Sequence, residues 1–242
     1  MIKFTSFSVK IALISILFFL TACEQSQQPV IDSNTTIKNQ VNTTVDLTGL
    51  WRGVLDSPGG ELPFGIEMSK DISKNNDTYS AKILNGEERV ETSSVDFVKN
   101  QITINFEWFD ARLKATLSED GQTMNGQWSK TASGKDKISE LPFIAQKGYE
   151  YRFKQELDNS IITPLKDQWE VTFTDEDGDS LAVAEFKQDK QIITGTFLTP
   201  TGDYRFLEGV VSNNKLYLSA FDGAHAFLFD AEVLDDKIIN GN

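Results

Sequence analysis

The chain has 242 residues, one cysteine and a formal net charge of −13, from 36 acidic and 23 basic residues. This acidic composition argues against a nucleic-acid partner, because binding the phosphate backbone needs clustered Lys and Arg. A single cysteine leaves no disulfide and no Cys-x-x-Cys redox pair within the chain, so a protein of this size needs a hydrophobic core. Its 17 Phe and 4 Trp are ample for one.

The first 22 residues have the pattern of a secretory signal peptide. Lys3 and Lys10 give a short basic region. The apolar run that follows, residues 11–22, is shorter than the roughly 20 residues that a membrane-spanning helix needs. We therefore set residues 1–22 apart from the part of the chain that is expected to fold.

The stretch "LTAC" at the end of this signal resembles the lipobox of bacterial lipoproteins. In that family the cysteine thiol is acylated and the chain is cut before it. The resemblance implies lipidation of Cys23 and a membrane partner reached through this lipid, while an ordinary secreted protein with a chance cysteine is the alternative. Glu24 stands where an Asp tends to cause inner-membrane retention in enteric-type bacteria. The resemblance therefore implies an exported lipoprotein of the cell envelope, at the outer membrane facing the periplasm or the cell surface rather than at the inner membrane.

Residues 23–45 are rich in Gln, Asn, Ser and Thr without periodicity, which predicts a flexible tether. From Asp46 onward, short stretches alternate between apolar and polar residues. Turn residues separate these stretches about every ten positions, which predicts an all-β sandwich or barrel. In "QITINFEW", the residues that are predicted to share one buried face are Ile102, Ile104, Phe106 and Trp108.

The strand pattern occurs twice along the chain. Trp51 in "LTGLWRG" aligns with Trp169 at an offset of 118 residues, and Gly126 in "MNGQW" aligns with Gly241 at an offset of 115. Such a repeat predicts two copies of one supersecondary unit. We expect two tandem antiparallel meanders, each a lipocalin- or calycin-like barrel or half-barrel. The expected segments are residues 46–147 for the first meander, 148–166 for a linker and 167–242 for the second meander.

The first meander contains a closing strand, "ISELPFIAQ", that has no counterpart in the second. The second copy reaches Asn242 at the point where this strand should begin. An unclosed barrel leaves two edges of unpaired N–H and C=O groups and half-covered apolar side chains. We therefore expect the second meander to lack its closing strand and the natural polypeptide to continue. A native terminus with a shorter second sheet is the alternative.

Two stretches of the sequence are candidate sites. The acidic "DEDGD", residues 175–179, carries the right ligands for calcium, but its spacing departs from the twelve-residue calcium loop. A hairpin turn, and no metal, is predicted there. His225 is the only histidine, and alternation with Phe227 and Phe229 predicts that it points to the apolar interior. It has no Cys partner and no clear carboxylate partner in the sequence, so it is weak evidence for catalysis or a metal site. No catalytic residue and no cofactor site is predicted.

The opening "LTGLWRG" resembles the "GxW" opening of lipocalin and avidin-like barrels, in which a Trp fills the closed end. A calycin-like barrel of this kind holds a small apolar ligand. If the chain binds one, the residues expected to line the site are His225, Trp51 and Trp169.

The stretch "LYLSAFDGAHAFLFDAEV" resembles the β-rich N-terminal region of TlpA-like thiol–disulfide oxidoreductase (redoxin) lipoproteins. The most specific element of the resemblance is "FDGAHAF", Phe221–Phe227. In that family a lipobox, a tether and a duplicated β region precede a thioredoxin-like domain with a Cys-x-x-Cys pair. The resemblance covers residues 48–242 plus the signal. This sequence contains no such domain and no second cysteine, so no catalytic residue is carried over and oxidoreductase activity is expected of a full-length protein only.

Two functions remain open at this point. The first is a non-catalytic β-rich module of an envelope thiol–disulfide oxidoreductase lipoprotein, acting as a spacer or interaction domain. Its expected partners are client proteins or a C-terminal thioredoxin-like domain. The alternative is a calycin-like lipoprotein that binds a small apolar ligand.

Overall fold

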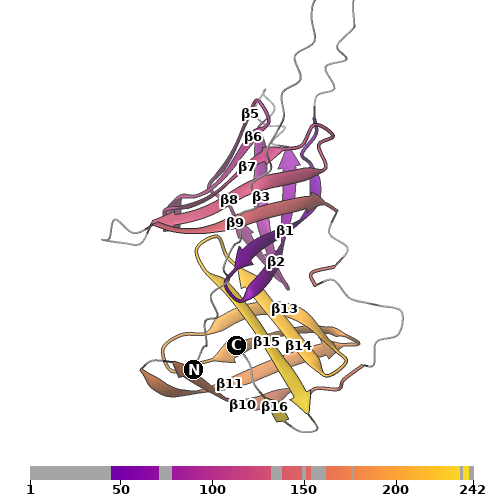
Figure 1. The fold of residues 1–242 in the computed structure, drawn as a ribbon, viewed down its shortest axis with the longest axis vertical. Coiled ribbons are helices and arrows are strands. Elements are labelled where there is room, and N and C mark those ends of the chain that lie inside the picture. The colour runs from indigo at the N-terminus through magenta and orange to yellow at the C-terminus, as the bar shows by residue number, and fades with distance from the viewer. Residues whose placement is uncertain are drawn as a thin grey trace, which may run out of the picture. The chain divides into compact units, whose positions relative to one another are not determined.

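The computed structural model in Figure 1 describes residues 45–70, 78–131, 138–148, 151–153, 162–175, 177–234 and 237–239. These residues belong to one compact unit, Thr43–Asn242. The predicted signal peptide, the tether before Val45 and Cys23 lie outside the described residues. Among the residues described, no helix has the length and apolar character needed to cross a bilayer.

Eight antiparallel strands form a closed barrel in the first part of this unit. The strand β9 (Ile138–Lys147) pairs with both β8 (Thr123–Thr131) and β1 (Gly49–Ser57) and so closes the ring, as predicted for "ISELPFIAQ". The short strand β4 (Glu88–Glu91) pairs only with β3, and a 3-10 helix η1 (Glu107–Phe109) connects β6 to β7. The strands of the ring are β1 (Gly49–Ser57), β2 (Gly60–Lys70), β3 (Tyr79–Asn85), β5 (Ser94–Val98), β6 (Gln101–Phe106), β7 (Ala111–Leu117), β8 (Thr123–Thr131) and β9 (Ile138–Lys147).

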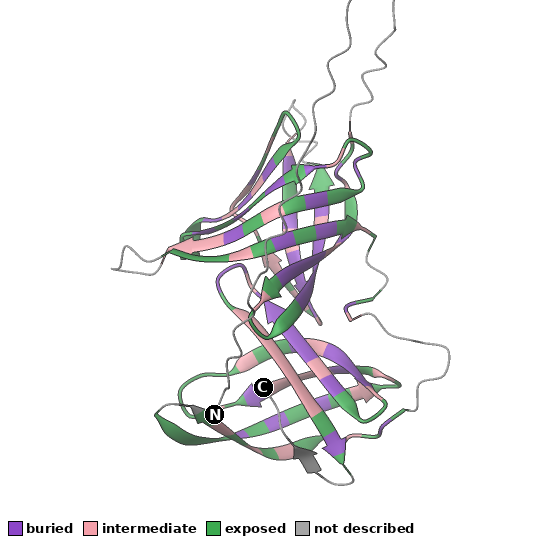
Figure 2. Cartoon of the chain, viewed as in Figure 1, coloured by how far each residue is buried: buried purple, intermediate pink, exposed green. Residues whose placement is uncertain are grey.

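Period-two alternation determines which side chains fill the barrel. Along β7, Leu113 and Leu117 are buried, whereas Arg112 and Lys114 are exposed. Figure 2 shows the same alternation of buried and exposed positions along other strands. Successive side chains of a strand point to opposite faces, so one face of each strand builds the core and the other meets solvent.

The second part of the unit is a half-barrel that stays open. Six antiparallel strands follow one another in chain order, and the three-residue strand β16 (Lys237–Ile239) adds to the last of them. No described strand pairs with the outer edge of β10 or of β16. The prediction of a second meander without its closing strand is confirmed. Its six main strands are β10 (Gln168–Asp175), β11 (Gly178–Asp189), β12 (Ile192–Leu198), β13 (Tyr204–Ser212), β14 (Lys215–Phe221) and β15 (Ala226–Leu234).

Equivalent turns of the two units share an unusual backbone geometry. Lys99 and Asn100, between β5 and β6, have φ values of 49° and 65°. Asn213 and Asn214, between β13 and β14, have φ values of 50° and 63°. Two consecutive residues with positive φ form the hairpin turn that matches the twist of the flanking strands. This correspondence is consistent with an internal repeat.

One prediction of strand alternation is wrong. Trp108 does not share the buried face of Ile102, Ile104 and Phe106 but is 86% exposed on η1. Asp110 adopts a left-handed conformation with φ of 50°, and its N–H donates to the Glu107 carbonyl. This tight turn ends strand geometry at Phe106, so the period of two no longer applies to Trp108.

Candidate functional site

The "FDGAHAF" stretch forms the hairpin between β14 and β15. Phe221 pairs with Ala226, and the four residues between them make the turn. One Asp222 carboxylate oxygen accepts the N–H of Ala224 at 2.8 Å and that of His225 at 2.6 Å. Gly223 has a φ of 96°, and a Cβ added there would collide with the Phe106 ring. The turn therefore needs an Asp to hold its N–H groups and a Gly where the barrel comes closest.

The hairpin places Phe221 inside the core of the closed barrel. The Phe221 side chain is fully buried, with its ring centroid 4.4 Å from that of Phe64, 6.0 Å from Phe106 and 6.1 Å from Trp128. The Trp128 indole N–H donates to the Gly223 carbonyl at 2.8 Å. We call the turn Phe221–Ala226 the plug, because it fills one end of the barrel interior with a side chain from the other β unit.

A buried arginine from the predicted linker lies behind the plug. Arg152 donates from Nε to Ser219 Oγ at 2.8 Å and from Nη2 to Asn85 Oδ1 at 2.9 Å and the Ser219 carbonyl at 3.0 Å. Its Nη1 donates to the Leu84 carbonyl at 3.1 Å and lies 3.3 Å from a Glu208 carboxylate oxygen. The single guanidinium thus binds β3 of the barrel and β13 and β14 of the half-barrel at once. Its planar, five-donor geometry suits such a multiple contact.

Asn85 completes this arginine network by pairing with the plug backbone. Its Nδ2 donates to the Phe221 carbonyl at 2.7 Å, and its Oδ1 accepts the Phe221 N–H at 3.1 Å. Ser219 Oγ in turn donates to the Pro63 carbonyl at 2.7 Å. No buried side-chain N or O atom of the described residues lacks a hydrogen-bond partner. A fully satisfied buried network fixes one relative arrangement, because breaking any member leaves a desolvated polar group.

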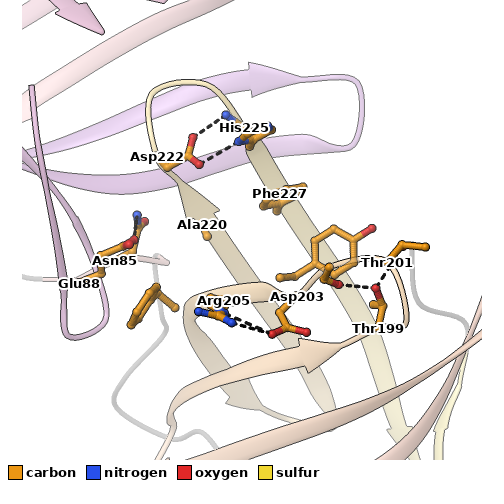
Figure 3. A pocket seen from close by; sticks show the side chains of 13 residues that line it. Asn85, Glu88, Thr199, Thr201, Asp203, Arg205, Ala220, Asp222, His225 and Phe227 are labelled. Atoms are coloured by element: carbon orange, nitrogen blue, oxygen red, sulfur yellow. Dashed lines mark hydrogen bonds and ion pairs between the residues drawn. The ribbon is translucent and has the colours of Figure 1, made fainter. Parts of the chain in front are cut away.

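A cavity of about 520 Å³ adjoins the plug. Its walls come from the β3–β4 hairpin, the loop between β12 and β13, and the β14–β15 hairpin. Figure 3 shows His225 and Asp222 facing each other at the tip of that last hairpin, and Arg205 beside Asp203. The His225 Nδ1 lies 2.9 Å from an Asp222 carboxylate oxygen, and its ring stacks parallel to that of Phe227 at 5.9 Å.

The charges around this cavity are mainly acidic. Burial raises the pKa of Glu88, and the nearby negative charge of Asp222 raises it further, while a long 3.5 Å hydrogen bond from Asn85 acts in the opposite direction. Asp203 is paired with Arg205 at 3.0 Å. The cavity is therefore a polar recess with one histidine, unlike the dry apolar interior that holds ligands in calycin barrels.

The chemistry of this recess is limited within the described part of the chain. A His–Asp pair becomes a hydrolytic site when a Ser, Thr or Cys nucleophile is bonded to the ring. No described side chain of these types is hydrogen-bonded to His225. Nor do the described residues contain three metal-ligating side chains close enough to hold one ion. The His225–Asp222 pair acts here as part of the turn that shapes the plug.

The prediction that His225 is interior and lacks a carboxylate partner is wrong. The His225 side chain is 51% exposed, and Asp222 is its partner. The residue belongs to the turn held by Asp222, and β15 begins only at Ala226. The alternation of Phe227 and Phe229 therefore cannot be extended back to His225.

The two tryptophans lie apart from the His225 cavity. Trp51 is fully buried in the barrel core and donates its indole N–H to the Leu47 carbonyl at 2.8 Å. Trp169 is half-buried against the core of the half-barrel and donates to the Lys166 carbonyl at 2.8 Å. Neither residue lines the cavity, so the structure does not bring His225 and the two tryptophans together.

The hairpin prediction for "DEDGD" is confirmed, because Asp175 of β10 pairs with Gly178 of β11. Sequence patterns did not predict the arginine network. Arg152 stands in a segment predicted to be a linker, and its partners are 56 to 68 residues away in the sequence. The only local signal is that two aromatic residues, Tyr151 and Phe153, flank it.

Comparison of this chain with family models, with curated protein sequences and with solved structures found no match.

Proposed function

We propose that this chain is a rigid, non-catalytic β-rich module of an envelope thiol–disulfide oxidoreductase lipoprotein, acting as a spacer or interaction domain. The observation that supports the proposal is the set of contacts between the two β units. We call this set, which consists of the plug and the Arg152 network, the joint. Interfaces between parts of one chain are usually polar and permit relative motion. Here the plug puts Phe221 of one unit into the core of the other, and the Arg152 network satisfies every buried polar group beside it.

Rigidity is what a spacer requires. A flexible joint would let an attached domain sample many distances from the membrane, whereas a fused core maintains one distance. The resemblance adds two supports. Its most specific element, "FDGAHAF", contains the plug, and in the resembling family such a region lies between a lipid anchor and a thioredoxin-like domain. On this proposal Cys23 carries the lipid and the module faces the periplasm or the cell surface.

Pulsed electron spin resonance tests the spacer role. Spin labels on Lys114→Cys in β7 and Lys187→Cys in β11, both at exposed positions, report the distance between the units in the full chain carrying Cys23→Ser. We expect a single narrow distance distribution. The matched variant Arg152→Met should broaden it, since the guanidinium contacts strands of both units. A broad distribution in the protein with an intact Arg152 would remove the basis for a spacer.

The lipoprotein and oxidoreductase parts of the proposal need their own measurement. A palmitate analogue supplied to cells that export the chain should label it, and Cys23→Ser should abolish the label. Photo-crosslinking from the module surface in its native envelope should trap a protein with a Cys-x-x-Cys pair. Crosslinks that consistently lack such a protein would contradict the link to disulfide exchange.

A small-molecule binder is a second candidate, favoured by the cavity of about 520 Å³ beside His225. The barrel interior itself is filled by large side chains, among them Phe64, Phe143 and Phe221. A ligand of the cavity would therefore meet polar groups as well as Phe227. Titration of small apolar ligands should give saturable binding that His225→Ala weakens, and a flat response would exclude this candidate.

A further inference from the structure

The outer edge of β10 presents backbone groups that no described strand uses. The Phe186 N–H donates to the Asp167 carbonyl at 2.8 Å, at the start of the β10–β11 register. Hydrogen bonds in an antiparallel pair alternate along each strand. The N–H and C=O groups of Glu170 and Thr172 therefore point away from β11, towards the open side of the half-barrel.

The closed barrel shows what occupies the equivalent edge. With the 118-residue offset of the repeat, the counterparts of Glu170 and Thr172 are Arg52 and Val54 of β1. These two residues are paired with Gln146 and Ile144 of β9. The edge of β10 thus has the same geometry as an edge that, in the other copy, is covered by one antiparallel strand.

The inner face of the half-barrel is half-covered on both sides of the opening. In the closed barrel the apolar residues that face the interior are buried, including Trp51 and Leu55 of β1 and Ala111, Leu113 and Ala115 of β7. The apolar side chains that stay half-buried in the half-barrel are Trp169, Val171 and Phe173 of β10 and Phe227, Phe229 and Ala231 of β15. An added strand with apolar residues at alternate positions would cover both rows.

The charges on the outer face of this edge are acidic. Glu170 and, on the neighbouring strand, Glu185 and Asp179 are exposed, in a chain whose net charge is −13. The residue of an added strand that faces Glu170 takes the position of Gln146 in β9. A basic residue at that position would be favoured, because opposite charges on directly facing residues stabilise a strand pair.

We propose that the open edge of β10 binds one extended segment of a partner polypeptide, antiparallel to β10, with apolar residues facing inward and Lys or Arg facing outward. This inference rests on the interaction role proposed above and names the chemistry of the partner. Main-chain hydrogen bonds to Glu170 and Thr172 supply affinity, and the alternate apolar side chains supply specificity, as in other cases of strand addition to a sheet edge.

A fluorescent peptide tests the proposal directly. Its sequence is that of Ile138–Lys147 with Gln146→Lys, so that it has the β9 pattern and a basic residue facing Glu170. Anisotropy titrated with the full chain should saturate. The same peptide N-methylated at the Ile144 position loses the N–H that faces β10. Its affinity should fall about tenfold, because one main-chain hydrogen bond is lost and the methyl group disturbs the strand pairing. A Gln146→Glu peptide should bind several-fold more weakly at low salt only.

Variants of β10 show whether the peptide occupies this edge. Thr172→Pro removes an outward-facing N–H and is tolerated at an edge strand, so peptide affinity should fall about tenfold while circular dichroism stays unchanged. Thr172→Val keeps the N–H and should stay within about twofold of the parent.

Three results overturn the proposal. They are no saturable binding by the folded chain, equal binding of the N-methylated peptide, and a concentration-dependent dimer that Thr172→Pro abolishes, which would assign the edge to a second copy. None of them alters the spin-label distance or the Cys23 label, so this inference and the proposed function fail separately.

Discussion

The closed barrel and the open half-barrel follow the same sequence pattern but bury it to different extents. Trp51 and Trp169 are in equivalent strands, and each donates its indole N–H to a carbonyl a few residues upstream, at 2.8 Å in both cases. Trp51 is nevertheless fully buried, whereas Trp169 is half-buried. Local geometry is thus the same at these two tryptophans, while burial depends on whether the ring of strands is closed.

The two units also contribute different kinds of residue to the contacts between them. The half-barrel contributes Phe221 to the core of the barrel, and the barrel contributes Asn85, which pairs with the Phe221 backbone. A half-barrel with an open side buries less apolar surface than a closed one and has less stability of its own. Its attachment to the barrel offsets part of that loss, so the joint is where the comparison is best tested.

The largest effect is expected from removing the plug side chain. Phe221→Ala leaves a cavity among Phe64, Phe106 and Trp128 and should lower the free energy of unfolding by about 4 kcal/mol. Urea denaturation followed by circular dichroism measures it. The matched variant Phe229→Ala removes a half-buried ring from the open unit and should cost about half as much. Equal losses of stability in the two variants would mean that closing the ring of strands does not increase the stability gained from burying a Phe side chain.

The next effect concerns the arginine network. Arg152→Met keeps an apolar stem but removes the guanidinium donors to Ser219 Oγ and to Asn85 Oδ1, which then keeps only the Phe221 N–H, so we expect a loss of about 3 kcal/mol. Arg205→Met, whose ion pair with Asp203 is exposed, should change stability by less than about 0.5 kcal/mol. If both changes had the same small effect in urea unfolding, the network would contribute nothing to joining the units.

A smaller effect compares the repeated tryptophans directly. Trp51→Phe loses buried volume and leaves the Leu47 carbonyl without its indole donor, which should cost about 2 kcal/mol. Trp169→Phe makes the same change beside the open edge, where water can replace the lost donor, and should cost less than about 1 kcal/mol. Adding the β9-like peptide should narrow this gap if the peptide covers Trp169. A larger cost for Trp169→Phe would reverse the comparison.

The sequence predicted the features that depend on neighbouring residues. Alternation predicted the strands, because the period of two is a local property, and the recurrence of the strand pattern predicted two antiparallel meanders and the closing role of "ISELPFIAQ". Two residues departed from the predicted alternation, also for a local reason. At Trp108 and at His225, a tight turn held by Asp110 or Asp222 interrupts the strand before the alternation resumes.

The joint between the units could not be predicted, because its contacts join residues far apart in the sequence. Asn85 and Phe221 are 136 positions apart, and Arg152 reaches Ser219 across 67. Alternation marks Phe221 as buried but does not say in which core. "FDGAHAF" is the most specific element of the family resemblance, yet its role as a plug depends on a barrel end that only the folded structure supplies.

The smallest expected effect is a pH dependence at the same joint. Burial raises the pKa of Glu88 in the folded protein above its ordinary value of 4.5, and Asp222 on the other unit adds to the rise. The folded state then binds the Glu88 proton more tightly than the unfolded chain does. This stabilisation is fully present below about pH 4.5 and is lost as the pH rises through the folded pKa.

Glu88→Gln cannot lose it, so at pH 7 the variant should be more stable than the parent by about 0.5 kcal/mol or less, since Glu88 is largely solvent-screened. Urea unfolding at pH 4 and pH 7 measures the difference. Glu87→Gln at the exposed neighbouring position is the control, and a Glu88→Gln effect of the same size at both pH values would show that Asp222 and burial do not act on this carboxyl group.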